Sequence, residues 1–423
     1  FIDPQTCIDC GACVEECPAE AIIPDDELSG HAEEYLRINA DYFRDHDVDG
    51  GVVVHRVIPP LPDGELHVAI VGAGPAAFYA AGELLDHPQV SVDMFDRLPT
   101  PYGLVRAGVA PDHAATKGVE TVFGAIAAKR NFTYFLNVEV GTHITHDELV
   151  DRYHAVIYAV GAAADKRLDI DGEELRGSMS ATEFVAWYNG HPDHVDVDVD
   201  LSAPRAVVVG NGNVALDVAR ILTSDPDDLA TTDIADHALT VLRASQVREV
   251  VILARRGVAQ ASYTNSEFLA LGDLRGVDVV IDPADLVLDP VTATALAAGT
   301  LDSTIATKIR LAAEFAERPL TEGNRRIVFR FLTTPLAMVG AERVGAVRTV
   351  GNSFAEVADS AEIVPSGPSA EIDAGLVLRA VGYRGKRVPN LPFDDSRGVV
   401  PHRNGRVHPV DDGGAHGLYV AAW

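Results

Sequence analysis

The sequence predicts an α/β protein made of two parallel-sheet domains, with a short cysteine-rich segment in front of them. Two observations carry this prediction. An apolar β run followed by a glycine-rich turn and a helix occurs twice, starting near residues 66 and 206. All four cysteines of the 423-residue chain lie within its first seventeen residues. A chain of this length holds two or three domains.

The amino-terminal cysteines have the spacing of an iron–sulfur site. The run is Cys7-x2-Cys10-x2-Cys13-x3-Cys17, and a proline follows it. This is the thiolate spacing of bacterial ferredoxins. Zinc sites and disulfides also use cysteine pairs, but a run this tight that ends in Cys-Pro favours a 4Fe–4S cluster. We expect Cys7, Cys10, Cys13 and Cys17 to be its ligands.

The same run bears on the extent of the first domain. In two-cluster ferredoxins the fourth cysteine of such a run binds the other cluster, and this chain has no further cysteine. We therefore expect the sequence to begin partway through a ferredoxin-like domain, with one or two clusters in the parent protein. The alternative is that Cys17 closes a single cluster. Residues 1–58 are assigned to this partial domain and its linker.

The first glycine-rich turn, Gly72-Ala73-Gly74-Pro75-Ala76-Ala77, follows the apolar run 66–71 and opens a predicted helix. A second predicted strand, 90–95, ends at Asp96. In the dinucleotide-binding fingerprint the glycines admit a pyrophosphate to the helix N-terminus, and an acid about 20 residues on accepts from ribose hydroxyls. We expect Gly72, Gly74 and Asp96 to bind a dinucleotide.

The second turn, Gly210-Asn211-Gly212-Asn213-Val214, repeats this arrangement after the apolar run 206–209. Its second strand, 249–254, runs into Arg255-Arg256 and carries no acid. A guanidinium fork matches a ribose 2′-phosphate, so this site should prefer NADP to NAD. The alternative, a pair of solvated surface arginines, loses weight beside the fingerprint.

Two Rossmann-like domains call for two ligands. FAD at the first site is the economical assignment, because a flavin takes up a hydride as two electrons and releases them singly. That conversion is needed between a nicotinamide and an iron–sulfur cluster. The residues therefore predict an oxidoreductase that uses FAD, NADP and a 4Fe–4S cluster.

From about residue 66 onward the chain resembles adrenodoxin reductase and its bacterial ferredoxin–NADP reductase relatives, some of which carry a ferredoxin in front. The stretches 98–113 (LPTPYGLVRAGVAPDH), 212–220 (GNVALDVAR) and 233–235 (DIA) carry this resemblance. It implies an NADPH–ferredoxin oxidoreductase with a ferredoxin or another one-electron acceptor as its partner. Asp96 stands where the family more often has Glu, and Ala77 replaces the last glycine of the first fingerprint.

The resemblance also implies site residues. It predicts FAD contacts at Ala76, Asp96, Leu104 and Val140, a tryptophan beside the flavin at Trp423, and NADP contacts at Asn211, Gly212, Asn213, Val214, Arg255, Arg256 and Glu267. The family continues past this tryptophan, so we expect the carboxyl end to be cut as well.

The order of the predicted elements fits a discontinuous first domain. Residues 66–161 plus 373–423 are expected to form the FAD domain, and residues 162–372 the NADP domain. The apolar runs 375–382 and 417–422 should then both rejoin the FAD sheet. The acidic run 193–200 is interpreted as a solvated crossing rather than a metal site, and 284–324 has helical spacing.

His113 and Glu267 are the candidate catalytic residues. His113 lies beside the loop expected near the flavin. A histidine titrates near neutrality and could take the proton that leaves as electrons depart. The alternative is a histidine that holds its loop by a hydrogen bond.

The formal charge of −29 argues against nucleic acid and anionic membranes as partners. Cluster-forming cysteines fit a reducing cytoplasm. Two other functions stay open: an electron-input subunit like that of glutamate synthase, and a non-catalytic iron–sulfur carrier or redox sensor. Reduction of an added ferredoxin by NADPH would separate the carrier from the two enzymes.

Overall fold

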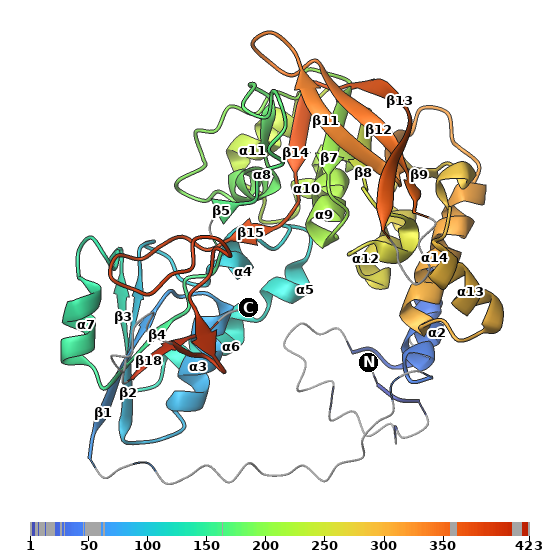
Figure 1. Ribbon diagram of the computed structural model, residues 1–423. Helices are drawn as coiled ribbons and strands as arrows, with labels where there is room; N and C mark the ends of the chain where they lie inside the picture. Colours follow the sequence, from blue (N-terminus) through green and yellow to red (C-terminus); the bar gives the residue numbers. More distant parts are fainter. Residues whose placement is uncertain are drawn as a thin grey trace.

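The computed structural model describes residues 2–4, 7, 13, 22–25, 28, 30–44, 46, 61, 64–162, 164–355, 362–407 and 417–421. Within them the predicted α/β class is confirmed. Two lobes, each built on its own largely parallel sheet, stand side by side (Figure 1). Between residues 64 and 407 the chain crosses between the lobes twice, and the two crossing segments pair as the short strands β5 and β15.

The α-helices are α2 (Glu34–Tyr42), α3 (Pro75–Leu84), α4 (Leu104–Ala107), α5 (Ala114–Lys117), α6 (Glu120–Ala127), α7 (His146–Arg152), α8 (Ala181–Tyr188), α9 (Asn213–Thr223), α10 (Pro226–Leu229), α11 (Asp236–Arg243), α12 (Asn265–Ala270), α13 (Pro290–Ala298) and α14 (Ser303–Glu317). The helix-like spacing of 284–324 is confirmed by α13 and α14. Among the described residues no helix is long and apolar enough to cross a membrane.

The strands are β1 (Leu66–Val71), β2 (Val90–Asp96), β3 (Phe132–Leu136), β4 (Ala155–Tyr158), β5 (Ala164–Asp165), β6 (Ser178–Ser180), β7 (Arg205–Val209), β8 (Glu249–Leu253), β9 (Val277–Ile281), β10 (Arg325–Arg330), β11 (Thr333–Val339), β12 (Ala346–Phe354), β13 (Ile363–Asp373), β14 (Leu376–Arg379), β15 (Tyr383–Arg384), β16 (His402–Arg403), β17 (Arg406–Val407) and β18 (Leu418–Val420).

The first lobe is built on a sheet of order β16-β17-β18-β4-β1-β2-β3. Its central strand β1 is buried on both sides over Val68–Val71, as expected of a parallel strand covered on both faces. Phe78 of α3 and Phe123 of α6 stack in the core on one face, with ring centroids 4.7 Å apart. β18 pairs with β4 in parallel, which confirms that the end of the chain rejoins this sheet.

The second lobe is built on a sheet of order β6-β14-β7-β8-β10-β9. Its largest core lies under the helices, and Phe268 and Phe315 there bring α12 and α14 onto the sheet. A smaller core lies between the sheet and an antiparallel layer of order β11-β12-β13, which the sequence analysis did not predict. β13 is an outer strand of that layer, as is β11.

One predicted strand lies in the other lobe. The run 375–382 was expected to rejoin the first sheet, but β14 pairs in parallel with β7 and β6 of the second sheet. The physical reason is packing: β14 lies between β6 and β7, and its Leu376, Val377 and Leu378 are buried in the cores on the two faces of the second sheet. The prediction for this strand is wrong. The predicted domain boundary at 372/373 consequently falls at the end of β13, before the second crossing.

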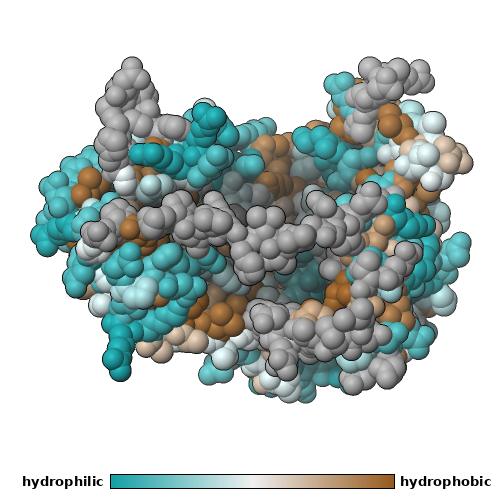
Figure 2. Space-filling model, turned by 90° about the horizontal axis from the view of Figure 1, so that it is seen from below, coloured by the Kyte–Doolittle hydropathy of each residue, from teal (hydrophilic) through white to brown (hydrophobic). Residues whose placement is uncertain are grey.

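The surface is hydrophilic over most of the view in Figure 2. In the view of Figure 2, teal side chains cover most of the outer faces, and brown side chains show in the hollow between the two lobes. Apolar side chains that face a hollow are available to pack against a bound group.

Candidate functional site

The first glycine-rich turn joins β1 to α3 and leaves the helix start open. Gly72 has φ +105, and a Cβ there would lie 2.3 Å from the carbonyl oxygen of Ala159, so a larger residue does not fit. Gly74 caps α3 without any side-chain hydrogen bond. Gly103 packs on it so closely that a Cβ on Gly103 would lie 2.9 Å from the Gly74 Cα. Uncovered N–H groups at a helix start suit a pyrophosphate.

Asp96, at the end of β2, holds this turn in shape. Its Oδ2 accepts a hydrogen bond from the Ala73 N–H at 2.7 Å, and its Oδ1 accepts from the Leu98 N–H at 2.8 Å. Each carboxylate oxygen keeps a second lone pair. Asp96 can therefore support the turn and still accept from a ribose hydroxyl.

Three further residues predicted for the first site lie on the same lobe. Ala76 is half-buried in the first turn of α3, and Leu104 is 58% exposed at the start of α4, directly after Gly103. Val140 is half-buried, and the nearby Val138 N–H donates to the Asp96 carbonyl at 2.8 Å. An exposed leucine beside a bare glycine turn offers an apolar contact to a ring system.

The second glycine-rich turn, between β7 and α9, uses the same device. Gly210 has φ +122, and a Cβ there would lie 2.2 Å from the carbonyl oxygen of Ala380. Gly212 caps α9 without a side-chain hydrogen bond. Asn211 and Asn213 also anchor the loop after β8. The Asn211 carbonyl accepts from the Tyr263 N–H at 3.1 Å, and Asn213 Oδ1 accepts from the Thr264 N–H at 2.8 Å.

Arg255 and Arg256 follow β8 and are both exposed. Their backbones are fixed: the Arg255 carbonyl accepts from Asn352 Nδ2 at 2.8 Å, and the Arg256 carbonyl accepts from the Leu332 N–H at 3.1 Å. Within the described part of the chain neither guanidinium makes an ion pair. Two fixed but unpaired cations at this strand end suit a phosphate.

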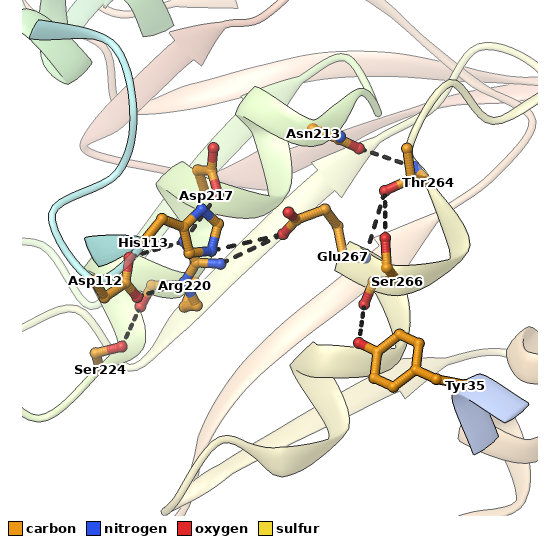
Figure 3. A network of polar contacts seen from close by, with 10 residues as sticks. All are labelled: Tyr35, Asp112, His113, Asn213, Asp217, Arg220, Ser224, Thr264, Ser266 and Glu267. Carbon is orange, nitrogen blue, oxygen red and sulfur yellow. Dashed lines mark hydrogen bonds and ion pairs between the residues drawn. The ribbon is translucent and has the colours of Figure 1, made fainter. Parts of the chain in front are cut away.

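The two candidate catalytic residues come from different lobes and meet (Figure 3). His113 precedes α5 of the first lobe, and Glu267 lies in the first turn of α12 of the second. His113 Nε2 lies 3.8 Å from Glu267 Oε2, and both side chains are about a quarter exposed. They are 154 positions apart in the sequence, so only the fold could bring them together.

A buried arginine organises this meeting point. Arg220 of α9 is 4% exposed. Its guanidinium donates to both oxygens of Asp112 at 2.7 and 2.9 Å and to Asp217 at 2.9 Å, and it lies 3.7 Å from Glu267. Burial raises the pKa of Asp217, and Arg220 offsets this only in part. The bidentate Asp112–Arg220 pair joins the lobes one residue from His113 (Figure 3).

Asp112, Asp217 and Arg220 lie inside the stretches that carry the resemblance, but no role for them was predicted. A signal was present: Asp217 and Arg220 are polar residues three apart on α9, which is otherwise apolar along its buried face. Their link to Asp112 depends on the packing of the lobes, which no local pattern reveals.

The predicted metal ligands are only partly described. Cys7 is exposed and Cys13 is half-buried. Cys10, Cys17 and Trp423 lie outside the described residues, so the predictions for them stay predictions.

Comparisons with known proteins agree with this arrangement of two turns and an amino-terminal cysteine run. Residues 66–265 match the pyridine nucleotide-disulphide oxidoreductase family, and residues 1–23 match the 4Fe-4S binding domain family. A solved structure, Mycobacterium tuberculosis FprA in complex with NADPH, superposes with a TM-score of 0.78 at 47% identity, covering 84% of this chain and 78% of that one.

Curated relatives extend the match over the whole chain. The chain is 46% identical to the probable ferredoxin/ferredoxin–NADP reductase of Mycobacterium tuberculosis, over all of this chain and 72% of the relative. It is 39% identical to the mitochondrial NADPH:adrenodoxin oxidoreductase of Arabidopsis thaliana, over 88% of this chain and 79% of the relative. The chain belongs to the adrenodoxin-reductase-type family of ferredoxin–NADP reductases, in a form with an iron–sulfur domain at its amino end.

Proposed function

We propose that this chain is an NADPH–ferredoxin oxidoreductase that holds FAD on the first lobe and NADP on the second. The family and its NADPH-binding and ferredoxin-reducing members support this activity. The observation that carries it is the meeting of His113 and Glu267 from opposite lobes, 3.8 Å apart. Each nucleotide-binding lobe supplies one titratable residue of this pair. Such a pair is well placed for a reaction between the ligands of the two lobes.

The electron balance explains the two-site design. NADPH gives up a hydride, which is two electrons and one proton, and leaves as NADP+. A flavin supplies the conversion, because it takes up both electrons together and releases them singly. Two one-electron acceptors, iron–sulfur clusters or ferredoxins, then each gain one electron, and one proton returns to solvent.

The residues around each turn support the assignment of ligands. Gly72, Gly74 and Ala76 would face the pyrophosphate of FAD, Asp96 its ribose, and Leu104 and Val140 its apolar surface. Gly210 through Val214 would hold the pyrophosphate of NADP. Arg255 and Arg256 would then bind the 2′-phosphate, where charge-assisted bonds give the preference for NADPH.

His113 and Glu267 would handle the proton. In this role His113 takes the proton that must leave as electrons depart, and Glu267 lies 3.8 Å from its ring. Arg220, 3.7 Å from Glu267, helps to position that carboxylate. Glu267 is also a predicted NADP contact. A nicotinamide nucleotide bound at the second turn could reach it, so Glu267 could both contact the nucleotide and take part in proton transfer.

The amino-terminal run Cys7, Cys10, Cys13 and Cys17 would hold a 4Fe–4S cluster as the first acceptor, with a ferredoxin as the outer partner. A cytoplasmic location fits, because a reducing compartment keeps the thiolates available as ligands.

An anaerobic assay tests this function. The cofactor-loaded protein is mixed with NADPH or NADH, and the reduction of an added ferredoxin is followed through cytochrome c. We expect rapid reduction with NADPH, slow reduction with NADH, and little reduction when the ferredoxin is omitted. Bound flavin without any NADPH-dependent reduction would favour the non-catalytic carrier. Reduction only in the presence of a partner enzyme would favour the electron-input subunit.

A further inference from the structure

Helix α2 belongs by sequence to the amino-terminal region, yet it packs on the second lobe, against α14 (Figure 1). Ile38 is the one buried residue of its nine, at 8% exposed. Ile38 joins the main core of the second lobe, together with Phe268 of α12 and Phe315 of α14. The hydrophobic contact of α2 is therefore with the NADP side of the molecule.

Polar contacts fix the same helix on the same surface. Glu34 forms an ion pair with Arg310 of α14, and both side chains are less than a third exposed. The Tyr35 hydroxyl donates to the Ser266 carbonyl at 3.4 Å. Ser266 directly precedes Glu267 in α12, so α2 reaches the helical turn that carries a candidate catalytic residue (Figure 3).

The helix also holds the start of the iron–sulfur segment. The Ile2 N–H donates to Asn39 Oδ1 at 2.7 Å, and Asn39 Nδ2 donates back to the Ile2 carbonyl. Ile2 lies five residues before Cys7, whose N–H donates to the Asp3 carbonyl at 2.9 Å. Asn39 thus ties the cysteine-bearing segment to a helix that Ile38 and Glu34 tie to the second lobe.

We propose that α2 is a docking helix. It packs against α12 and α14 of the NADP lobe, and it holds the start of the amino-terminal iron–sulfur segment there. This deepens the proposed function, on which its kinetic consequence rests. A docked segment has a high effective concentration near the site, so its reduction becomes intramolecular and independent of protein concentration. Release of α2 should therefore slow the reduction of the attached cluster and spare reactions that do not need it.

Hydrogen–deuterium exchange of the cofactor-loaded protein tests the contact itself. A nine-residue helix is marginal in water on its own, so protection of its amides reports docking. Ile38→Asp removes the apolar anchor. Glu34→Arg places two like charges at the Arg310 contact and leaves the core intact. Glu33→Arg is the matched control: it changes the charge equally, one residue earlier, at an exposed position for which the described structure has no ion pair.

We expect slow exchange over residues 30–44 in the wild type and in Glu33→Arg. Exchange should be faster by about tenfold or more in Glu34→Arg and Ile38→Asp. Both of these variants should reduce the attached cluster more slowly with NADPH, while the NADPH–ferricyanide rate stays at the wild-type value. Unprotected α2 amides in the wild type, or cluster reduction at full rate after α2 is released, would overturn the proposal. Absence of any NADPH–ferricyanide activity, with the exchange pattern as expected, would instead count against the proposed function.

Discussion

Arginines occur in two different settings at this site, and the setting decides what each can do. Arg220 is buried and shares its charge among Asp112, Asp217 and Glu267, so it is committed to holding the lobes together. Arg255 and Arg256 are exposed, and in the described structure their guanidinium groups have no carboxylate partner. A bound phosphate would be their first counter-charge, which is why we propose that they distinguish NADPH from NADH.

Replacing Arg255 and Arg256 with alanine should raise the KM for NADPH and leave the KM for NADH little changed. Each lost charge-assisted contact is worth about 1.5–3 kcal/mol, or roughly 10- to 150-fold in KM. Arg243→Ala is the matched control, because Arg243 is an exposed arginine of the same lobe paired with Asp227. Steady-state kinetics with both nucleotides is the measurement. Equal losses with NADPH and NADH would remove the 2′-phosphate assignment.

At the scale of elements, the two nucleotide turns are built alike, and this likeness explains the misplaced strand. Ala159-Val160-Gly161 follows β4, and Ala380-Val381-Gly382 follows β14. Each alanine carbonyl oxygen lies against the first glycine of its own turn. The Ala159 oxygen lies against Gly72, and the Ala380 oxygen lies against Gly210. The second Ala-Val-Gly therefore belongs to the second lobe. The repeat was readable in the sequence, but the order of strands in a sheet was not.

Local patterns predicted the rest of the site unevenly. The glycine turns, Asp96 and the arginine pair could be predicted from their spacing in the sequence, because each lies within one βαβ unit. The contact of His113 with Glu267 and the docking of α2 depend on how separate units pack. The layer β11-β12-β13 escaped prediction because its strands mix apolar and polar residues, and Met338 and Val347 are buried only through packing against the second sheet.

Single glycine substitutions should separate the two sites. Gly210→Ala places a methyl group against the Ala380 carbonyl and should abolish NADPH binding while flavin absorbance is retained. Gly72→Ala should do the reverse and lose the flavin. Gly276→Ala is the control, because Gly276 also has a positive φ (+68) but no atom within 4 Å of the added carbon. Flavin content and NADPH titration are the measurements. Loss of both ligands from either variant would mean that the sites fold as one unit.

At the scale of the whole molecule, attraction between the lobes competes with general repulsion. Among the described residues, three pairs between an arginine or lysine and a carboxylate join the lobes: Arg97–Asp193 at 2.6 Å, Lys117–Asp233 at 2.7 Å and Asp112–Arg220 at 2.7 Å. The first two involve exposed carboxylates, and such pairs are worth about 0–1 kcal/mol each. Against them stands a net charge of −29, which repels itself throughout the fold.

Salt should therefore stabilise the protein. Raising the ionic strength from about 0.01 to 1 M shortens the Debye length from about 30 to 3 Å and screens the long-range repulsion. The buried Asp112–Arg220 pair is screened least. We expect the midpoint of thermal unfolding to rise with sodium chloride, and the rise to persist in Lys117→Ala. A midpoint that falls with salt would show that the exposed pairs outweigh the repulsion.

The outer strand β13 has a consequence for behaviour at high concentration. An eleven-residue edge strand offers a row of amides on which another chain can add and polymerise. Here Pro365 and Pro368 supply no N–H, and Gly367 has φ +81, which breaks the run of extended backbone between them. Glu371 and Asp373 add negative charge toward the end of the strand. These features disfavour the pairing of another strand with this edge. We therefore expect the protein to resist aggregation through β13 although the strand is long and exposed.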